Sequence, residues 1–193
     1  MLPRVSAAGK ALQQSLAPAK GRRWFTPARL WDVLALIVIA FVIWKLLFAP
    51  RSLPQSAARP APTVVLESLT GKPFVLAAHR GRVVFLDFYA SWCAPCKLSL
   101  PLVERFARTH PEVDVVPVDV GESPVIAGEF ARRYGLHRVA LDRDQLAANW
   151  FGVVGFPTMV VVDPRSRVRA TWPGLNPAIG LNMASAESQL RRD

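Results

Sequence analysis

The chain has 193 residues with a formal net charge of +10, and 51% of them are apolar. This length fits one domain of ordinary size with its own core. The basic excess does not indicate nucleic-acid binding, because residues 63–193 hold 15 Lys or Arg against 13 Asp or Glu, a net of +2. The excess therefore lies near the N-terminus, where it is better interpreted as setting membrane topology. We expect no nucleic-acid partner.

The N-terminal part of the sequence predicts a membrane anchor. Residues 1–29 contain six Lys or Arg and no acid, and residues 30–49 are apolar except for Asp32 and Lys45 near the two ends. Twenty helical residues cover about 30 Å, the thickness of a bilayer core. The basic side of a membrane helix stays in the cytoplasm. The sequence therefore predicts a cytoplasmic tail (1–29) and a single transmembrane anchor (30–49), with the rest of the chain outside.

A cleavable signal peptide is the alternative interpretation, since small residues occur at 56–58. The apolar run, however, exceeds the usual signal core of about 7–15 residues. Residues 50–62 contain four prolines and no apolar periodicity, which is typical of a semi-extended linker. We expect the folded domain to occupy residues 63–193.

The first predicted elements of the domain are strands. Residues 64–69 and 74–76 flank Thr70-Gly71-Lys72-Pro73 and are predicted to form a hairpin. Residues 83–89 form a continuous apolar run, typical of a strand buried on both faces. After Cys96 the apolar residues recur at helical spacing, which predicts a helix. These residues are Leu98, Leu102, Val103, Phe106 and Ala107.

The only two cysteines lie between this strand and this helix, in Trp92-Cys93-Ala94-Pro95-Cys96-Lys97. A helix N-terminus presents free N–H groups and positive potential, which favour a thiolate. Cys93 precedes or caps the helix, so we expect it to be the more exposed cysteine and the attacking thiolate. Cys96, in the first turn, would be the resolving cysteine. Pro95 suits an early helical position, where it stiffens the turn.

Three other interpretations of the cysteine pair are weaker. A zinc site needs two more ligands, and His79, His110 and His137 stand alone without ligand-like spacing. A structural disulfide that closes so small a loop would remove little chain entropy. Paired thiolates could bind Cu(I), but no His or Met cluster lies nearby. We therefore expect a redox-active pair and neither a metal nor a cofactor.

Asp87 interrupts the apolar strand six residues before Cys93. A buried carboxylate has a raised pKa and can exchange a proton near neutral pH. The alternative is a structural acid paired with a nearby Lys. We favour the role in proton exchange.

The remaining predicted elements alternate between strands and helices. Pro157 stands just before one of these strands. The predicted elements are a buried strand at 113–120, a helix opened by residues 121–124 with Val125, Phe130 and Tyr134 as its apolar stripe, a short strand at 138–141, a short helix at 145–151, a strand at 159–163, an edge strand at 168–172 and an amphipathic helix at 176–191.

The segment 87–97, followed by Pro101, resembles the active-site segment of thioredoxin-fold oxidoreductases. The wider layout, over residues 63–175, is similar to the membrane-anchored TlpA/ResA/CcmG branch of bacterial proteins that act outside the cytoplasm. Cys93 lies 64 residues before Pro157, a wider spacing than in plain thioredoxin, and this indicates the central insert of that branch. The resemblance implies an α/β thioredoxin fold with an N-terminal strand extension and a central insert, preceded by one transmembrane helix.

The same resemblance implies a cis bond before Pro157, close to the attacking cysteine. The backbone of Phe156 would then offer strand-like hydrogen bonds to a substrate segment, with Trp92 and Pro95 as further substrate contacts. Asp87 would help to deprotonate Cys96 through water, although many TlpA-like sequences carry asparagine here. A functional acid often lies in the insert. Glu122 and Glu129 are candidates, but we predict solvated surface positions for both.

By resemblance, the protein would reduce disulfides of periplasmic protein partners from the bacterial inner membrane. Its electrons would come from a DsbD/CcdA-type membrane protein. Cytochrome c maturation is a common task in this branch. An oxidase that introduces disulfides remains the main alternative, because the Ala94-Pro95 dipeptide does not decide the direction of electron flow.

Overall fold

The structure, a computed structural model, describes residues 27–48 and 58–192, and in the first of these ranges it describes the side chains of residues 31–45. The chain divides into an N-terminal helical unit and a C-terminal folded unit. Most of the predicted cytoplasmic tail lies outside the described residues. The predicted linker is described only from residue 58 onward.

Helix α2 (Pro27–Phe48) has 22 residues and covers most of the predicted anchor. Every described side chain from 31 to 45 is exposed, including Trp31, Ile37 and Trp44. Within the residues that the structure describes, no helix is both long enough and apolar enough to cross a membrane. The helix is present where the sequence predicts one, and its insertion into a bilayer stays a prediction.

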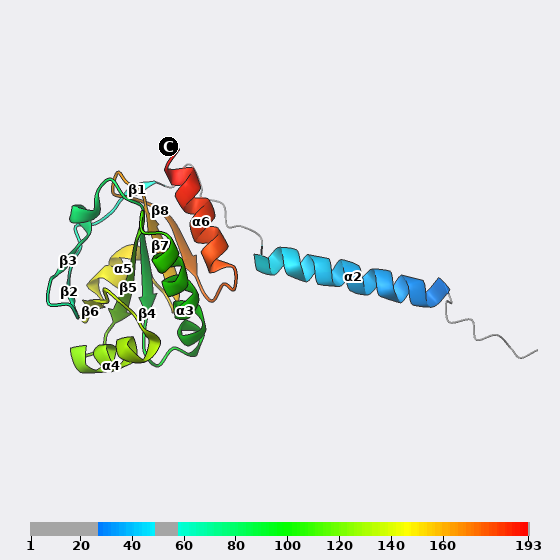
Figure 1. Cartoon of the computed structure of the whole chain (residues 1–193), viewed down its shortest axis with the longest axis horizontal. Helices are drawn as coiled ribbons and strands as arrows, with labels where there is room; N and C mark the ends of the chain where they lie inside the picture. The colour runs from blue at the N-terminus through cyan, green and yellow to red at the C-terminus, as the bar shows by residue number, and fades with distance from the viewer. Residues whose placement is uncertain (1–26, 49–57, 193) are drawn as a thin grey trace, which may run out of the picture. The chain divides into compact units, whose positions relative to one another are not determined.

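The C-terminal unit contains an eight-stranded sheet in the order β1-β8-β7-β4-β5-β6-β2-β3 (Figure 1). Strands β4, β5 and β6 are parallel to one another, and the other pairings are antiparallel. The strands are β1 (Arg59–Pro60), β2 (Val65–Ser68), β3 (Phe74–Val75), β4 (Val84–Tyr89), β5 (Asp114–Val120), β6 (Ala140–Asp142), β7 (Thr158–Val162) and β8 (Arg167–Pro173). Strands β2 and β3 form the expected N-terminal extension, and β6 belongs to the expected central insert.

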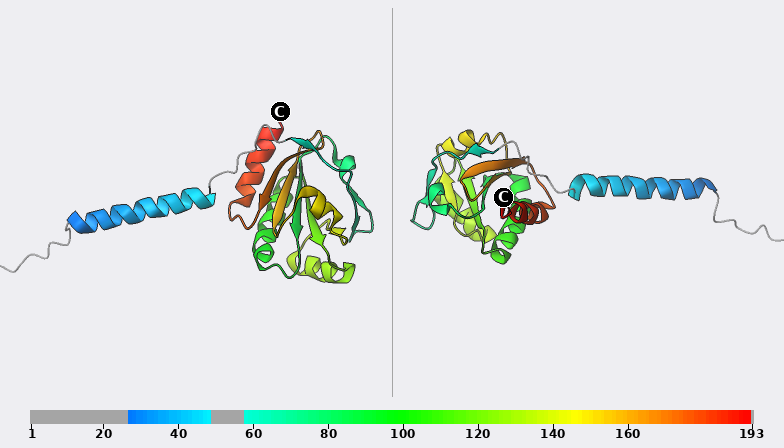
Figure 2. Two further views of the ribbon diagram at one scale, coloured as in Figure 1. Left: turned by 180° about the vertical axis from the view of Figure 1, so that it is seen from behind. Right: turned by 90° about the horizontal axis from the view of Figure 1, so that it is seen from above.

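Helices cover both faces of this sheet, as Figures 1 and 2 show from opposite sides. Every residue of β4 is buried, and its alternate side chains enter different clusters. Phe85 packs with residues of α3 (Ala94–Thr109) and α6 (Ile179–Leu190), whereas Phe88 packs with Phe151 of α5 (Leu146–Phe151). The helices are η1 (Leu76–His79, a 3₁₀ helix), α3 (Ala94–Thr109), α4 (Pro124–Tyr134), α5 (Leu146–Phe151) and α6 (Ile179–Leu190).

Strand β1 is the main departure from the predicted layout. Arg59 and Pro60 lie in the segment predicted as linker, yet they pair with Val168 and Arg167 of β8. The folded unit therefore reaches further toward the N-terminus than residue 63. Strand β8 is consequently not an edge strand, because β1 covers it.

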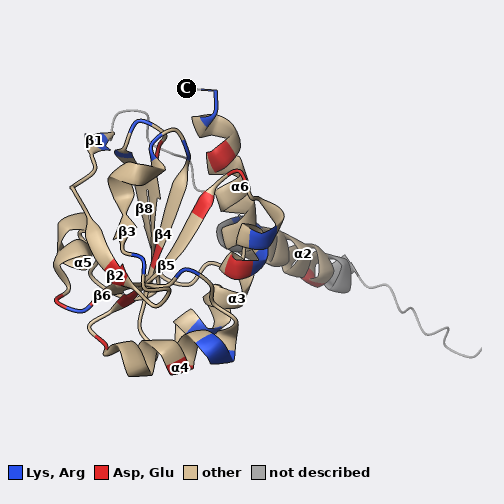
Figure 3. Cartoon of the chain, turned by 60° about the vertical axis from the view of Figure 1, so that its left-hand side comes forward, with Lys and Arg blue, Asp and Glu red and all other residues tan. Residues whose placement is uncertain are grey.

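The parallel strands β4 and β5 run side by side and end at the same edge of the sheet, with Tyr89 opposite Asp119. The loop after Tyr89 leads to both cysteines, and the loop after Val120 leads into α4. Both strands are apolar apart from acidic positions, which Figure 3 shows in red on the central strands. This edge is where side chains from two loops can meet at the cysteine pair.

Candidate active site

Cys93 and Cys96 occupy the start of α3, as the sequence predicts. Cys93 is the N-cap residue, and its Sγ accepts a hydrogen bond from the backbone N–H of Cys96, with 3.2 Å between sulfur and nitrogen. Pro95 lies in the first turn, where a missing N–H leaves no bond unmade. The two sulfurs form a disulfide with an S–S distance of 2.05 Å. In the reduced protein the same N–H would stabilise a Cys93 thiolate.

Cys93 is less accessible than the sequence suggests. It is 4% exposed and Cys96 is 0% exposed, so the predicted order holds, but both are buried. Phe156 packs against the apolar cluster that contains the two cysteines. Trp92 is 70% exposed, and its ring meets that of Phe156 edge-on, with 5.8 Å between centroids. A partner must therefore approach Cys93 beside these two aromatic rings.

The peptide bond between Phe156 and Pro157 is cis, which confirms the expectation drawn from the resemblance. Phe88 of β4 is paired with Thr158 of β7, so Pro157 lies beside the end of β4, where the cysteine loop begins. Among the described residues, neither backbone group of Phe156 has an intramolecular hydrogen-bond partner. Those groups are available to an extended segment of another protein.

Asp87 is 2% exposed in the middle of β4. Burial, with a smaller contribution from the charge of Glu104, raises the pKa of Asp87 to about 7. Its Oδ2 has no hydrogen-bond partner and Asp87 makes no ion pair within the described part of the chain. The alternative of a structural Asp–Lys pair is therefore not supported. The carboxyl group can exchange a proton near neutral pH.

A small cavity connects Asp87 with the cysteine helix. It has a volume of about 10 Å³, at the lower limit for one water molecule, and Asp87, Ser99 and Pro157 contribute to its walls. Ser99 Oγ in turn donates a hydrogen bond to the backbone carbonyl of Cys96 at 3.4 Å. The structure thus places the predicted proton acceptor and the cis-proline around one space, one helical turn from the resolving cysteine.

Glu122 contradicts the prediction of a solvated surface position. Its side chain is half-buried, and its two carboxylate oxygens accept hydrogen bonds from Ser91 of the cysteine loop. Glu129 is exposed, as predicted. The sequence showed only that Glu122 lies two residues after a buried strand; the parallel pairing of that strand with β4, which brings the two loops together at one edge, is seen only in the structure.

A second acid at this edge was not singled out from the sequence. Asp119 is 1% exposed, and neither of its carboxylate oxygens has a hydrogen-bond partner of good geometry among the described residues; the same holds for the hydroxyl of Tyr89. Burial and the neighbouring Glu122 raise the pKa of Asp119 to about 8. Burial, Asp119 and Glu122 also raise the pKa of Tyr89. Acidic groups with raised pKa values therefore gather behind the cysteine loop.

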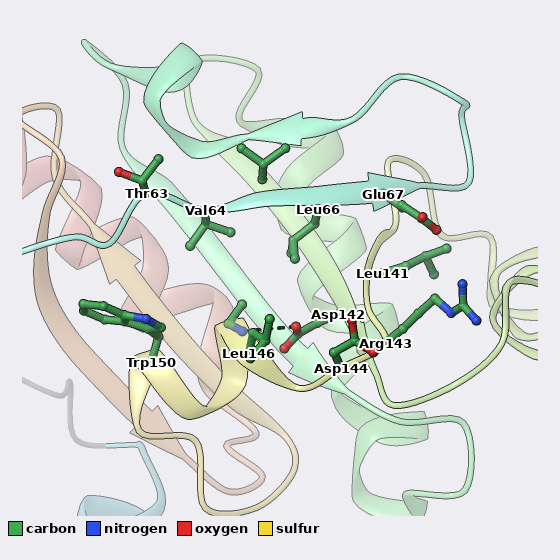
Figure 4. A pocket seen from close by; sticks show the side chains of 12 residues that line it. Thr63, Val64, Leu66, Glu67, Leu141, Asp142, Arg143, Asp144, Leu146 and Trp150 are labelled. Carbon is green, nitrogen blue, oxygen red and sulfur yellow. Dashed lines mark hydrogen bonds between the residues drawn. The ribbon is translucent and has the colours of Figure 1, made fainter.

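A larger pocket of about 470 Å³ lies away from the cysteines, between β2 and α5 (Figure 4). Its buried acid, Asp142, accepts hydrogen bonds from the backbone N–H groups of Ala147 and Ala148 at 3.1 and 2.7 Å. These bonds satisfy two free amides at the start of α5. Asp142 therefore has a structural role.

Comparison with known proteins agrees with this geometry. The Redoxin family model matches residues 56–190. The chain belongs to the Redoxin family. It is similar to the thiol-disulfide oxidoreductase ResA of Bacillus subtilis (strain 168), with 32% identity over 152 residues, 77% of this chain and 84% of that protein. It is also similar to ResA of Geobacillus thermodenitrificans, with 29% identity over 71% of this chain and 80% of that protein.

A solved structure shows the same fold with moderate sequence identity. The putative thiol:disulfide interchange protein DsbE from Chlorobium tepidum superposes with a TM-score of 0.63 and 29% identity, covering 69% of this chain and 95% of that one. StoA from Bacillus subtilis, with a TM-score of 0.56 and 23% identity, supports the fold alone. The predicted thioredoxin-like α/β fold is confirmed, and the protein is a thiol:disulfide oxidoreductase.

Proposed function

We propose that this protein is a membrane-anchored reductase that passes two electrons from a Cys93–Cys96 dithiol to disulfides of protein partners outside the cytoplasm. The observation that carries the proposal is the bonded cysteine pair at the start of α3, beside the cis-Pro157 loop. Its relatives are named thiol-disulfide oxidoreductases, and the basic N-terminal tail followed by an apolar segment supports the location.

The first step is attack by Cys93 on the partner's disulfide. The Cys93 thiolate forms a bond with one partner sulfur, the partner's S–S bond breaks, and the second partner sulfur leaves as a thiolate that takes up a proton. The backbone N–H of Cys96 and the positive end of the α3 dipole favour the thiolate form of Cys93 in the reduced protein. The product is a mixed disulfide.

The second step releases the partner. Cys96 loses its proton to Asp87, through a water molecule in the small cavity, and its thiolate attacks Cys93 Sγ. The mixed disulfide breaks, the Cys93–Cys96 disulfide forms, and the second partner thiol leaves. A carboxyl with a pKa of about 7 is suited to accept this proton and return it when the pair is reduced again.

The surface beside Cys93 is suited to an extended protein segment. The backbone groups of Phe156 are available for strand-like hydrogen bonds, and exposed Trp92 and Pro95 flank Cys93 in the chain. We propose these three residues as substrate contacts. A peptide held by its backbone there would bring its own cysteine toward Cys93 without a requirement for one sequence.

The remaining part of the proposal concerns location and electron supply. Helix α2 would hold the domain at the outer face of a bacterial inner membrane, with the N-terminus in the cytoplasm. A dithiol in an oxidising compartment needs a source of electrons. A DsbD/CcdA-type membrane protein is the proposed source, and cytochrome c maturation, common in the branch that the sequence resembles, is the pathway to test first.

Trapping tests the exchange chemistry. In Cys96→Ser the resolving step is removed, so mixed disulfides through Cys93 should accumulate in cells and be released by dithiothreitol. The double variant Cys93→Ser, Cys96→Ser is the matched control and should trap nothing. If Cys96→Ser yields no more cross-linked species than the double variant, Cys93 is not the attacking residue.

The reduction potential tests the direction of electron flow. Equilibration with glutathione should give a value nearer to about −270 mV, as in thioredoxin, than to about −120 mV, as in a strong oxidant. A value at the oxidising end would make the protein an oxidase that introduces disulfides.

Membrane attachment is tested with a single charge in the apolar segment. Ile39→Lys places a charge near the middle of α2, which costs about 2.5–3.5 kcal/mol for insertion. The variant should lose membrane retention, whereas Ile39→Leu should keep it. In spheroplasts, an impermeant maleimide should label reduced Cys93. Equal retention of both variants would remove the anchor from the proposal.

A further inference from the structure

The cysteines are presented by a tight turn whose geometry is specific. The backbone N–H of Cys93 donates to the carbonyl of Ala90 at 3.1 Å, so residues 90–93 form a turn with Ser91 and Trp92 at its centre. This turn closes immediately before the N-cap of α3. Its conformation decides where Cys93 Sγ lies relative to the N–H of Cys96, which it contacts at 3.2 Å.

Glu122 holds this turn from a different element. Its Oε2 accepts the backbone N–H of Ser91 at 2.7 Å, and its Oε1 accepts the Ser91 hydroxyl at 2.6 Å. Both distances are short, as expected for charge-assisted hydrogen bonds. Because two bonds reach one residue through two atoms, they fix its position and its orientation together.

The loop that carries Glu122 is itself fixed on both sides. Gly121 has a φ of +78°, and its N–H donates to the carbonyl of Asp142 at 3.1 Å. Ser123 is the N-cap of α4, and its Oγ accepts the N–H of Ile126 at 3.4 Å. Glu122 therefore reaches Ser91 from a rigid support, and a rigid support is what a positioning residue requires.

The contacts of Glu122 place it behind the turn rather than at the reacting sulfurs. Beyond Ser91, it lies close to buried Asp119, which neighbours Tyr89 at the end of β4. This edge thus contains three ionisable side chains on adjacent elements, and only Glu122 bonds to the cysteine loop.

We propose that Glu122 is a positioning residue of the dithiol site: by holding Ser91 it fixes the turn from Ala90 to Cys93 and so sets the reactivity of the Cys93 thiolate. The proposal rests on the role of Cys93 as the attacking thiol. When the turn is held, Cys93 Sγ stays within reach of the Cys96 N–H. When it is released, the thiolate loses that donor, its pKa rises, and attack slows.

The test compares two variants of Glu122 that differ in hydrogen bonding but not in charge. Glu122→Gln can keep both bonds, since its carbonyl accepts the Ser91 N–H and its amide donates to the Ser91 hydroxyl. Glu122→Ala keeps neither. The readout is the rate of alkylation of Cys93 by iodoacetamide against pH, in the reduced full-length protein, with the modified cysteine identified by mass spectrometry.

We expect Glu122→Ala to lower the alkylation rate at pH 7 about tenfold, as the loss of one thiolate hydrogen bond would, and to move the pH midpoint upward. Glu122→Gln should remain within about twofold of the original protein. Ser91→Ala, which removes only the hydroxyl bond, should fall between them. Glu129→Ala, which removes an exposed acid of α4, is the control and should have no effect.

Other outcomes overturn the proposal in distinguishable ways. If Ala and Gln both accelerate alkylation equally, Glu122 acts through its charge and not by positioning. If both leave the pH midpoint unchanged and lower only the unfolding temperature, its role is structural. Should Glu122→Ala fail to fold, Ser91→Ala decides, and a rate equal to that of the original protein rejects the proposal. If Cys93 is no more reactive than Cys96 in the original protein, the proposed function fails first.

Discussion

The two ends of β5 hold two buried aspartates in opposite circumstances. Asp114, at the start of the strand, is 5% exposed and accepts hydrogen bonds from His79 at 2.8 Å and Arg82 at 2.7 Å, with Arg138 at 3.5 Å. Asp119, near the end of the same strand, is 1% exposed and lies beside Tyr89 and another acid, Glu122.

The pKa values follow these surroundings. Burial acts to raise the pKa of Asp114, but the hydrogen bonds and charges of His79 and Arg82 outweigh it, so the pKa is lowered. Burial and Glu122 raise the pKa of Asp119 to about 8. At the start of the strand a charged carboxylate with cationic partners stabilises the fold, whereas the acid at the cysteine-loop end has no cationic partner among the described residues and is held mostly protonated at neutral pH. Asp87, on the neighbouring strand β4, resembles Asp119 in that burial raises its pKa.

The comparison predicts that removing the charge of Asp119 stabilises the protein. A carboxyl whose pKa rises from 3.8 to about 8 on folding contributes stability below pH 3.8 and loses that contribution as the pH rises to about 8. Asp119→Asn should therefore increase the free energy of unfolding by about 3 kcal/mol at pH 9, with little change at pH 4. Urea denaturation at both pH values measures this, with exposed Asp144→Asn as the control. Destabilisation at pH 9 would mean that Asp119 has a partner there.

Removing the carboxylate of Asp87 should slow the second step of the exchange reaction, the release of the partner. Asp87→Asn cannot accept the proton of Cys96, so release of the mixed disulfide should slow about a hundredfold at pH 7. Alkylation of Cys93, the first step, should change little and serves as the internal control. Because the pKa of Asp87 is about 7, the rate of release in the original protein should rise with pH up to about that value. Equal release rates in both proteins would exclude Asp87 as the base.

At the start of β5, removal of the charge of Asp114 should destabilise the folded protein. Asp114→Asn removes the negative charge that faces Arg82 and His79, leaves them a neutral amide oxygen as acceptor, and should lower the free energy of unfolding by about 2 kcal/mol at pH 7. The lowered pKa means that this stability is present above pH 3.8 and is lost as the pH falls through the folded-state value. Urea denaturation should therefore show the stabilities of the two proteins converging as the pH falls below 3.8. If Asp114→Asn were more stable than the original protein at pH 7, the ion pairs of Asp114 would not stabilise the fold.

The smallest expected effect concerns one partner of Asp114. His79→Ala removes a hydrogen bond of 2.8 Å and a ring contact with Phe74, while Arg82 remains, so the loss should be about 1 kcal/mol at pH 7. The same denaturation experiment measures it. A loss as large as that of Asp114→Asn would show that Arg82 contributes nothing to the pair.

The sequence was sufficient for the features that depend on local pattern. The buried run before Cys93, the helical spacing after it and Pro95 in the first turn predicted the strand, the helix and the capping position of the cysteine. Helix α4 begins where residues 121–124 predicted a helix start, with Ser123 as its N-cap, and Gly135, with a positive φ, ends it. The cis bond at Pro157 followed from resemblance, because no local pattern specifies it.

The features that the sequence did not reveal depend on contacts between distant segments. Glu122 meets Ser91 across 31 residues, and nothing in Gly121-Glu122-Ser123 indicates which loop lies opposite. Strand β1 consists of two residues, one of them a proline, so it has no periodicity; its partner β8 lies about a hundred residues later. The low exposure of Cys93 likewise accompanies packing between distant segments, since its cluster includes residues of α4 and β6 and Phe156 packs against it. To predict any of these three features, one must first know which strands pair, because the pairing decides which loops and side chains lie together.

The two edge strands of the sheet are too short to pair readily with extended segments of other proteins. Both β1 and β3 contain only two residues, and Pro60 has no N–H to offer. The two edge strands therefore offer few backbone groups with which an extended polypeptide could pair. Among the described residues, the backbone groups of Phe156 have no partner, and they are the docking place that we propose for such a chain. If Phe156 is the substrate contact proposed above, the short outer strands would direct strand addition toward the redox pair and disfavour aggregation along the edges of the sheet.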